Sequence, residues 1–129
     1  MSRIFAASSN KLMECNKEEA VRTKEIAEVR MRSNHFAEAL RLAQKAQRLF
    51  PELENLSQML AVCEIHCSAQ TRVSGSEHDW YAIIQVEESA DDTTIRKQYR
   101  KFALLLHPDK NKFTGAEAAF KLIVEANRV

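Results

Sequence analysis

Glycine and proline, the residues that most often interrupt a helix, are almost missing from this chain, which contains 2 of each in 129 residues. Alanine, leucine, glutamate, lysine and arginine, the strongest helix formers, are abundant. Hydrophobic residues make up 45% of the sequence, which is enough for a core. The sequence therefore predicts an all-α protein.

The overall charge and hydropathy exclude two classes of partner. The 19 basic and 18 acidic residues leave a net charge of +1, whereas domains that bind nucleic acid are usually strongly basic. No apolar run approaches the roughly 20 residues that are needed to span a bilayer. We therefore expect neither a nucleic-acid partner nor a membrane partner.

Three cysteines cannot all pair with one another, and reduced thiols are typical of cytoplasmic or nuclear proteins. Cys63, His66 and Cys67 lie within about one helical turn, but the paired spacing of structural zinc sites is missing. We interpret them as residues of a packing face and expect no metal and no cofactor.

Residues 1–12 carry two basic residues, no acid and an apolar run too short for a signal peptide. We interpret them as a disordered leader that precedes the folded part of the chain.

Residues 13–69 show helical periodicity in three runs. The pattern predicts a first helix that ends near Asn34, a second that ends at Pro51 and a third marked by residues 53–63. Together they predict a helical hairpin with a third helix packed on it. The residues expected on the inward side of the first helix are Val21, Ile26, Ala27 and Val29.

Residues 34–51 resemble the second half of a tetratricopeptide unit, with an aromatic residue, two close-packing alanines and a terminal proline in the expected places. Ala27 replaces the usual small glycine, and Arg30 replaces an expected aromatic residue. A single unit is too short to form the concave groove of a repeat array. The matching residues are Phe36, Ala39, Ala46 and Pro51.

Residues 70–77 interrupt the apolar periodicity with serine, threonine and glycine, which is typical of a flexible linker. Each side of this linker has its own apolar stripe. We therefore expect residues 13–69 and residues 78–129 to fold as separate units.

A basic amphipathic segment, residues 94–106, leads into the tripeptide His107-Pro108-Asp109. Arg96 and Arg100 are four residues apart, so they share one face of the predicted helix and make it positive. Pro108 cannot continue the helical hydrogen bonds, so the helix ends there and holds His107 and Asp109 at a corner. The apolar stripe consists of Ile95, Tyr99, Phe102, Ala103 and Leu106.

The start of the same helix has two candidate capping residues, Ser89 and Asp91, and Asp92 is well placed for the helix dipole. A polar loop, residues 110–115, follows the tripeptide, and residues 116–129 form a second helix-forming run.

This order of helix, His-Pro-Asp, loop and helix resembles a J domain, the module by which DnaJ-type co-chaperones activate the ATPase of seventy-kilodalton heat-shock chaperones. The resemblance covers residues 79–129. Residues 79–86 resemble the first J-domain helix, residues 95–106 the second, and residues 118–121 the third. The chain is most similar to plant J-domain proteins whose N-terminal helices start with the sequence seen here at residues 13–20.

The resemblance implies that the second helix and the tripeptide dock on the partner ATPase. The implied contact residues are Arg96, Tyr99, Arg100, His107, Pro108 and Asp109, with Lys97, Lys101 and Lys110 as secondary contacts. The residues implied to hold the helices together are Tyr81, Ile84, Ile95, Phe102, Leu106, Phe120 and Ile123.

Two departures from the J-domain pattern affect the expected packing. The short fourth helix is absent, and Asn127 stands where an aromatic residue is common. We therefore expect the far end of the third helix to pack less tightly.

The resemblance implies a monomeric co-chaperone that stimulates ATP hydrolysis by a seventy-kilodalton chaperone, assists protein folding and contacts unfolded clients. The chain has no phosphate-cradling glycine loop, and His107 and Asp109 have no paired nucleophile, so we expect no enzymatic activity of its own. An alternative is a helical scaffold that binds other proteins through its N-terminal half, and this role can coexist with the first.

Overall fold

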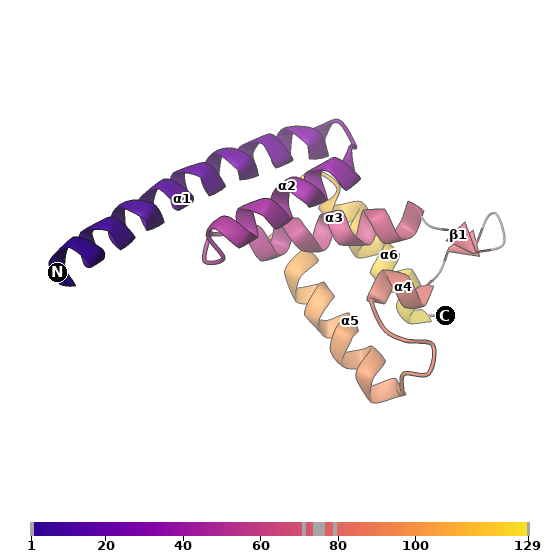
Figure 1. Ribbon diagram of the computed structural model, residues 1–129. Coiled ribbons are helices and arrows are strands. Elements are labelled where there is room, and N and C mark those ends of the chain that lie inside the picture. The colour runs from indigo at the N-terminus through magenta and orange to yellow at the C-terminus, as the bar shows by residue number, and fades with distance from the viewer. Residues whose placement is uncertain (1, 71, 74–76, 79, 129) are drawn as a thin grey trace.

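The computed structural model describes residues 2–70, 72–73, 77–78 and 80–128 (Figure 1). These residues are all-α, as predicted, apart from one short antiparallel pair of strands. The elements are α1 (Ser2–Arg32), α2 (Phe36–Leu49), α3 (Leu56–Gln70), β1 (Arg72–Val73), β2 (Glu77–His78), α4 (Trp80–Ile84), α5 (Asp92–Leu106) and α6 (Ala116–Arg128).

Helices α1 and α2 form the predicted hairpin, which turns at Asn34 with a φ of 62°. Asparagine adopts this left-handed conformation more readily than most residues. Ala27 of α1 and Ala39 and Ala46 of α2 are fully buried, and their small side chains allow close helix packing. Arg30, which replaces an aromatic residue of the repeat pattern, pairs with Glu38 of α2 at 3.3 Å.

The predicted inward side of α1 is wrong for three of its four residues. Val21, Ile26 and Val29 are exposed, and only Ala27 is buried. The sequence pattern gave weight to the larger aliphatic side chains, whereas this hairpin is held by small residues. The true stripe has helical spacing and consists of Ala20, Thr23, Ala27 and Met31.

The predicted disordered leader is also wrong, because α1 begins at Ser2. Residues 2–12 contain no glycine or proline, and adding residues to an existing helix costs far less than starting a new one. The packed part of α1 therefore extends as a continuous helix toward the N-terminus, past the end of α2 (Figure 1).

Helix α3 lies at the centre of the molecule and is apolar on almost every side. Such a helix is stable in water only when it is covered all round. It packs on α2 and also on α4, α5 and α6, and one continuous core includes residues from all of these helices. Its buried residues are Leu56, Met59, Leu60, Ala61, Val62, Cys63, Ile65 and Ala69.

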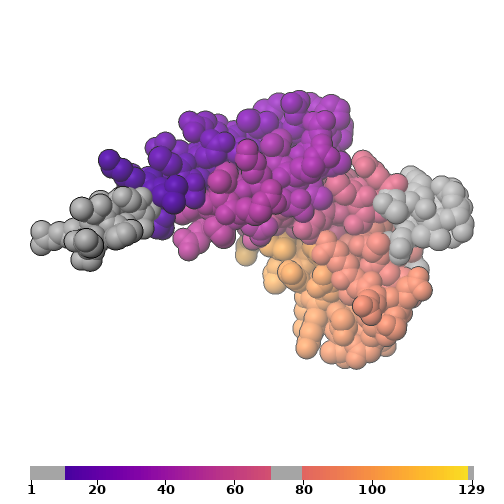
Figure 2. Space-filling model, viewed as in Figure 1, coloured from indigo at the N-terminus to yellow at the C-terminus, as the bar shows by residue number. Residues whose placement is uncertain are grey.

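The expectation of two separately packed halves is therefore wrong. Figure 2 shows α4 and α5 lying directly against the layer that contains α2 and α3. The predicted linker, residues 70–77, is partly regular structure, because α3 includes Gln70 and Arg72–Val73 pairs with Glu77–His78. Residues 71 and 74–76 of that linker lie outside the described residues.

Helix α5 has the boundaries that its sequence predicts. Of the two candidate caps, Asp91 is used, and its Oδ1 accepts a hydrogen bond of 2.8 Å from the Thr94 backbone N–H. Hydrogen bonds from the Thr94 side chain and backbone hold the pKa of the Asp91 carboxyl below its usual value. The helix ends at Leu106, immediately before His107 and Pro108.

The packing between α4, α5 and α6 follows most of the predicted residues. Ile84, Phe102, Leu106 and Ile123 are buried, and Ile95 and Phe120 are partly buried. Tyr81 differs from the prediction, since it remains 42% exposed. Ile83 of the same helix, α4, is fully buried in its place.

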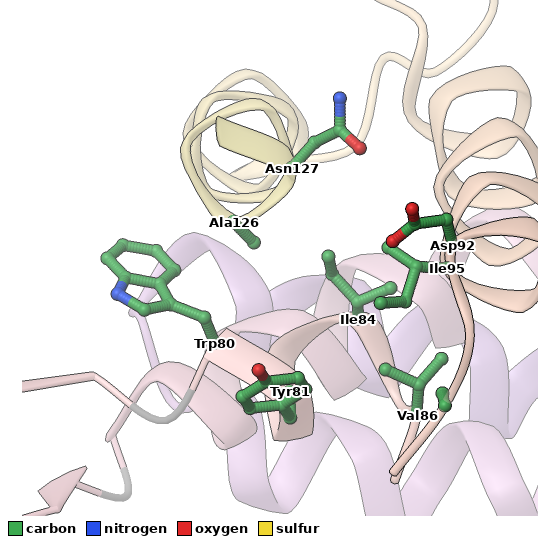
Figure 3. A pocket seen from close by; sticks show the side chains of 9 residues that line it. Trp80, Tyr81, Ile84, Val86, Asp92, Ile95, Ala126 and Asn127 are labelled. Atoms are coloured by element: carbon green, nitrogen blue, oxygen red, sulfur yellow. The ribbon is translucent and has the colours of Figure 1, made fainter. Parts of the chain in front are cut away.

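Asn127, which stands where an aromatic residue is common, lies at the far end of α6. A pocket of about 300 Å³ lies there, between α4, the start of α5 and the end of α6. Figure 3 shows Ala126 and Asn127 on one side of this pocket and Ile84 and Ile95 on the other. Its lining residues are Trp80, Tyr81, Ile84, Val86, Ala90, Asp92, Ile95, Ala126 and Asn127.

The shared core gives a testable expectation. Ile65→Ala removes a fully buried side chain of α3 and should lower the free energy of unfolding by about 2–5 kcal/mol. Thermal unfolding followed by circular dichroism, which reports all helices, should still coincide with unfolding followed by the fluorescence of Trp80. Val29→Ala, at an exposed position, is the control and should change stability little. Separate transitions for the two probes would contradict a common core.

Candidate docking site

The exposed side of α5 carries four basic side chains, Arg96, Lys97, Arg100 and Lys101. They lie opposite the buried Phe102 and Leu106, because the helix turns by 100° per residue. None of the four forms an ion pair with another residue that the structure describes. Their charge is therefore available to a partner. Tyr99, at the border of this basic face, is half-buried.

One residue of this surface is not predicted by the sequence pattern. Leu104 is 69% exposed, and it lies one helical turn after Arg100 and Lys101, within the basic face. In the sequence, Leu104 is a leucine that lies off the apolar stripe of its helix. That placement is the signal by which it could have been identified. The basic face therefore also presents an apolar side chain that contacts solvent.

Beyond α5, the chain turns sharply at His107-Pro108-Asp109. The backbone N–H groups of Lys110 and Asn111 both donate to the His107 carbonyl at 2.9 Å. The Lys112 ammonium donates to the Pro108 carbonyl at 2.9 Å. These bonds hold the tripeptide in a compact corner at the end of the basic face, and Lys110 lies exposed beside it.

Of the two ionisable side chains of the corner, the His107 ring lies edge-on against Phe120 of α6, with centroids 6.1 Å apart, whereas the Asp109 side chain points to solvent. The His107 Nδ1 accepts a hydrogen bond of 3.3 Å from the Asp109 backbone N–H, so in the neutral ring the proton is on Nε2. The Asp109 carboxylate is 3.7 Å from Nδ1, which is too far for a hydrogen bond, and this side chain is 88% exposed. The carboxylate is thus presented to a partner.

Two of the three cysteines, the buried Cys63 and the half-buried Cys67, have thiols that burial keeps protonated. Burial, together with the nearby Cys67 and Glu64, raises the pKa of the Cys63 thiol to about 12. Burial, followed by the charge of Glu64, also raises the pKa of Cys67. A thiol that stays protonated is a poor nucleophile and metal ligand. In the part of the chain that the structure describes, no cluster of histidine, cysteine or acidic residues could hold a metal ion.

Three features together define a class of protein: an exposed basic helix, the His-Pro-Asp corner that ends it, and the antiparallel helix α6 packed on its apolar side. They define a J domain. Residues 79–129 match the family model of the DnaJ domain, so this part of the chain is a DnaJ-type J domain.

Comparison of the chain with known proteins finds relatives in animals and plants. DnaJ homolog subfamily B member 12 of Mus musculus is 34% identical over an alignment 161 positions long, which covers 91% of this chain and 43% of the relative. Chaperone protein dnaJ 49 of Arabidopsis thaliana is 31% identical over 147 residues, which cover 88% of this chain and 41% of the relative. DnaJ protein homolog 1 of Drosophila melanogaster is 53% identical over 51 residues, 40% of this chain and 15% of the relative.

The coverage of these alignments has two consequences. With the first two relatives the similarity extends beyond the J domain into the N-terminal helices, because it includes about nine-tenths of the chain. The chain spans about two-fifths of the length of those relatives.

No solved structure matches the chain. Among the described residues, no helix is long and apolar enough to cross a membrane.

Proposed function

We propose that this chain docks on a seventy-kilodalton heat-shock chaperone and stimulates its ATP hydrolysis, thereby assisting protein folding. The observation that carries the proposal is the exposed His107-Pro108-Asp109 corner at the end of an unpaired basic helix face. Contacts are assigned to the basic face, the corner and Lys110. The proposed contact residues are Arg96, Lys97, Tyr99, Arg100, Lys101, His107, Pro108, Asp109 and Lys110, together with Leu104.

The proposed mechanism requires no chemistry by this chain. Arg96, Lys97, Arg100 and Lys101 steer the protein toward an acidic surface of the ATPase. Docking then presents the Asp109 carboxylate to the partner. Hydrolysis is accelerated because the docked corner binds the hydrolysing state of the partner more tightly than its resting state. The chain therefore acts as a regulator and not as an enzyme.

A scaffold role for the N-terminal helices is a second proposal, and one observation favours it. Leu12 and Met13 are exposed on α1, which at 31 residues is far longer than the 14-residue α2 packed beside it. Apolar side chains in this position offer a contact for a client or another protein.

We propose that the protein is a monomer and that it carries out both roles in the cytoplasm or nucleus.

Asp109→Asn should abolish the stimulation of ATP hydrolysis and leave the helix content unchanged, because the carboxylate is exposed and accepts no hydrogen bond from the residues that the structure describes. Single-turnover hydrolysis by a purified seventy-kilodalton chaperone, with circular dichroism of the variant, measures both. Glu125→Gln removes a similar exposed charge from α6 and should stimulate like the wild type. Wild-type stimulation by Asp109→Asn would exclude the proposed mechanism.

Arg96→Ala combined with Arg100→Ala should weaken docking, and added salt should weaken docking of the wild-type chain. Each exposed charge contributes only about 0.2–1 kcal/mol, so the double change should raise the Kd by about twofold to thirtyfold. Titration calorimetry at two salt concentrations measures the effect. Arg41→Ala with Arg48→Ala, two exposed positions of α2, is the matched control. A Kd that changes neither with salt concentration nor with the α5 substitutions would argue against a role of the basic face in docking.

Leu104→Ala should weaken docking without destabilising the fold, because this side chain contacts solvent in the free protein. Truncating a leucine that becomes buried in an interface costs about 1–3 kcal/mol, which corresponds to a Kd increase of roughly fivefold or more. The matched control is Ile26→Ala, whose side chain is 48% exposed on α1. An unchanged Kd for Leu104→Ala would remove this residue from the docking surface.

A further inference from the structure

We propose that the N-terminal helices contribute to the activity of the J domain. They do so by holding in place the loop that fixes the His107-Pro108-Asp109 corner. In this proposal His66 of α3 is a positioning residue for that corner. The inference rests on the proposed function for its activity readout, but the geometry of the loop tests it independently. It assigns a role to α1, α2 and α3 in a reaction that the resemblance places in residues 79–129 alone.

The most direct contact joins His66 to the loop. Its Nε2 lies 2.8 Å from the carbonyl oxygen of Gly115. A carbonyl can only accept a hydrogen bond, so the His66 ring is the donor and carries its proton on Nε2. The same ring stacks on Phe36, the first residue of α2, with centroids 4.0 Å apart and planes inclined by 9°. Phe36 is buried and thus fixes the ring in its donating orientation.

Gly115 shows how closely the loop is pressed against these rings. Its φ is +90°, a conformation that residues with a side chain rarely adopt. A Cβ at this position would lie 2.8 Å from the His66 Nε2 and 2.8 Å from the Phe36 Cζ. The glycine is therefore required both by the backbone and by the two side chains of the N-terminal helices.

Asn111 forms a second attachment, two residues after Asp109. Its side chain is one of the few buried polar groups among the described residues, with 4% exposure. The Nδ2 donates to the Leu105 carbonyl at 3.0 Å and to the Gln58 carbonyl of α3 at 3.3 Å. The Oδ1 accepts from the Phe113 backbone N–H at 3.0 Å. One side chain thus ties the loop to α3 and to the end of α5.

A third attachment comes from α1. The Lys24 ammonium donates to the Glu54 carbonyl at 2.9 Å and lies 5.7 Å from the centre of the Phe113 ring. This is within the range of a cation–π interaction. All three N-terminal helices therefore contribute a contact to residues 111–115.

These attachments reach the corner through the backbone. The N–H groups of Lys110 and Asn111 both donate to the His107 carbonyl, so a displacement of Asn111 must disturb the turn that contains Asp109. The basic face of α5 depends on the loop only at its last turn, where the Leu105 carbonyl accepts from Asn111, because α5 is otherwise a regular helix that begins at its own cap. Loss of the loop attachment should therefore lower the stimulation reached at saturation more than it lowers docking affinity.

Substitution of His66 tests the proposal in the full chain. His66→Phe keeps a ring for stacking on Phe36 but removes the donor to Gly115, whereas His66→Gln can place an amide N–H near the same carbonyl. One hydrogen bond of ordinary strength corresponds to a factor of about two to ten. We expect His66→Phe to lower maximal stimulation by about that factor with a Kd within about twofold of the wild type. We expect His66→Gln to recover at least part of the loss.

The matched control is Glu64→Ala. It breaks the hydrogen bond of 2.7 Å between Glu64 and Gln85, which also joins α3 to the J-domain helices but does not touch the loop. It should leave stimulation unchanged. Amide NMR resonances of residues 107 and 109–111 give a readout that needs no partner. They should shift in His66→Phe, return toward wild type in His66→Gln and stay in place in Glu64→Ala.

The outcomes separate this inference from the proposed function. Unchanged stimulation and unchanged resonances of residues 107 and 109–111 in His66→Phe would overturn the inference. A parallel loss in Kd and in maximal stimulation, with no recovery in His66→Gln, would also overturn it, since that pattern indicates general destabilisation. If the wild-type chain itself fails to stimulate, the proposed function is wrong, and the resonances alone decide whether His66 positions the corner.

Discussion

The burial of α3 is the constraint on which the rest of the structure depends. A 15-residue helix with eight buried residues spread around it must be covered on several sides. Helix α2 covers one side, and α4, α5 and α6 cover the others. Removing either group of helices would expose apolar surface worth several kcal/mol. The N-terminal hairpin and the J domain are therefore halves of one core and not two modules on a tether.

This arrangement attaches the residues next to the His107-Pro108-Asp109 corner to the N-terminal helices. The corner itself must be exposed so that a partner can reach Asp109, and exposed turns are usually the least stable parts of a fold. Here residues 111–115, which follow the corner, are in contact with His66, Gln58 and Lys24 of the N-terminal helices. In the proposed function these contacts lie away from the basic face, so that face keeps its charge and its exposure.

The local features were predictable because local chemistry determines them. Pro108 ends α5, and Asp91 caps it. The features that could not be predicted depend on which surfaces meet. The inward side of α1 is set by the small residues of α2, so the larger Val21, Ile26 and Val29 misled the pattern. The role of His66 depends on residue 115, which is 49 positions away in the sequence.

Native-state hydrogen exchange tests most directly whether the chain is one cooperative structure built on α3. The slowest-exchanging amides of α2 and those of α6 should open with the same free energy, because both helices lose their core when α3 is uncovered. Low concentrations of urea should lower the two opening free energies in parallel. Opening of α6 at a clearly lower free energy than α2, with a smaller dependence on urea, would show that the J-domain helices unfold on their own and would contradict this account.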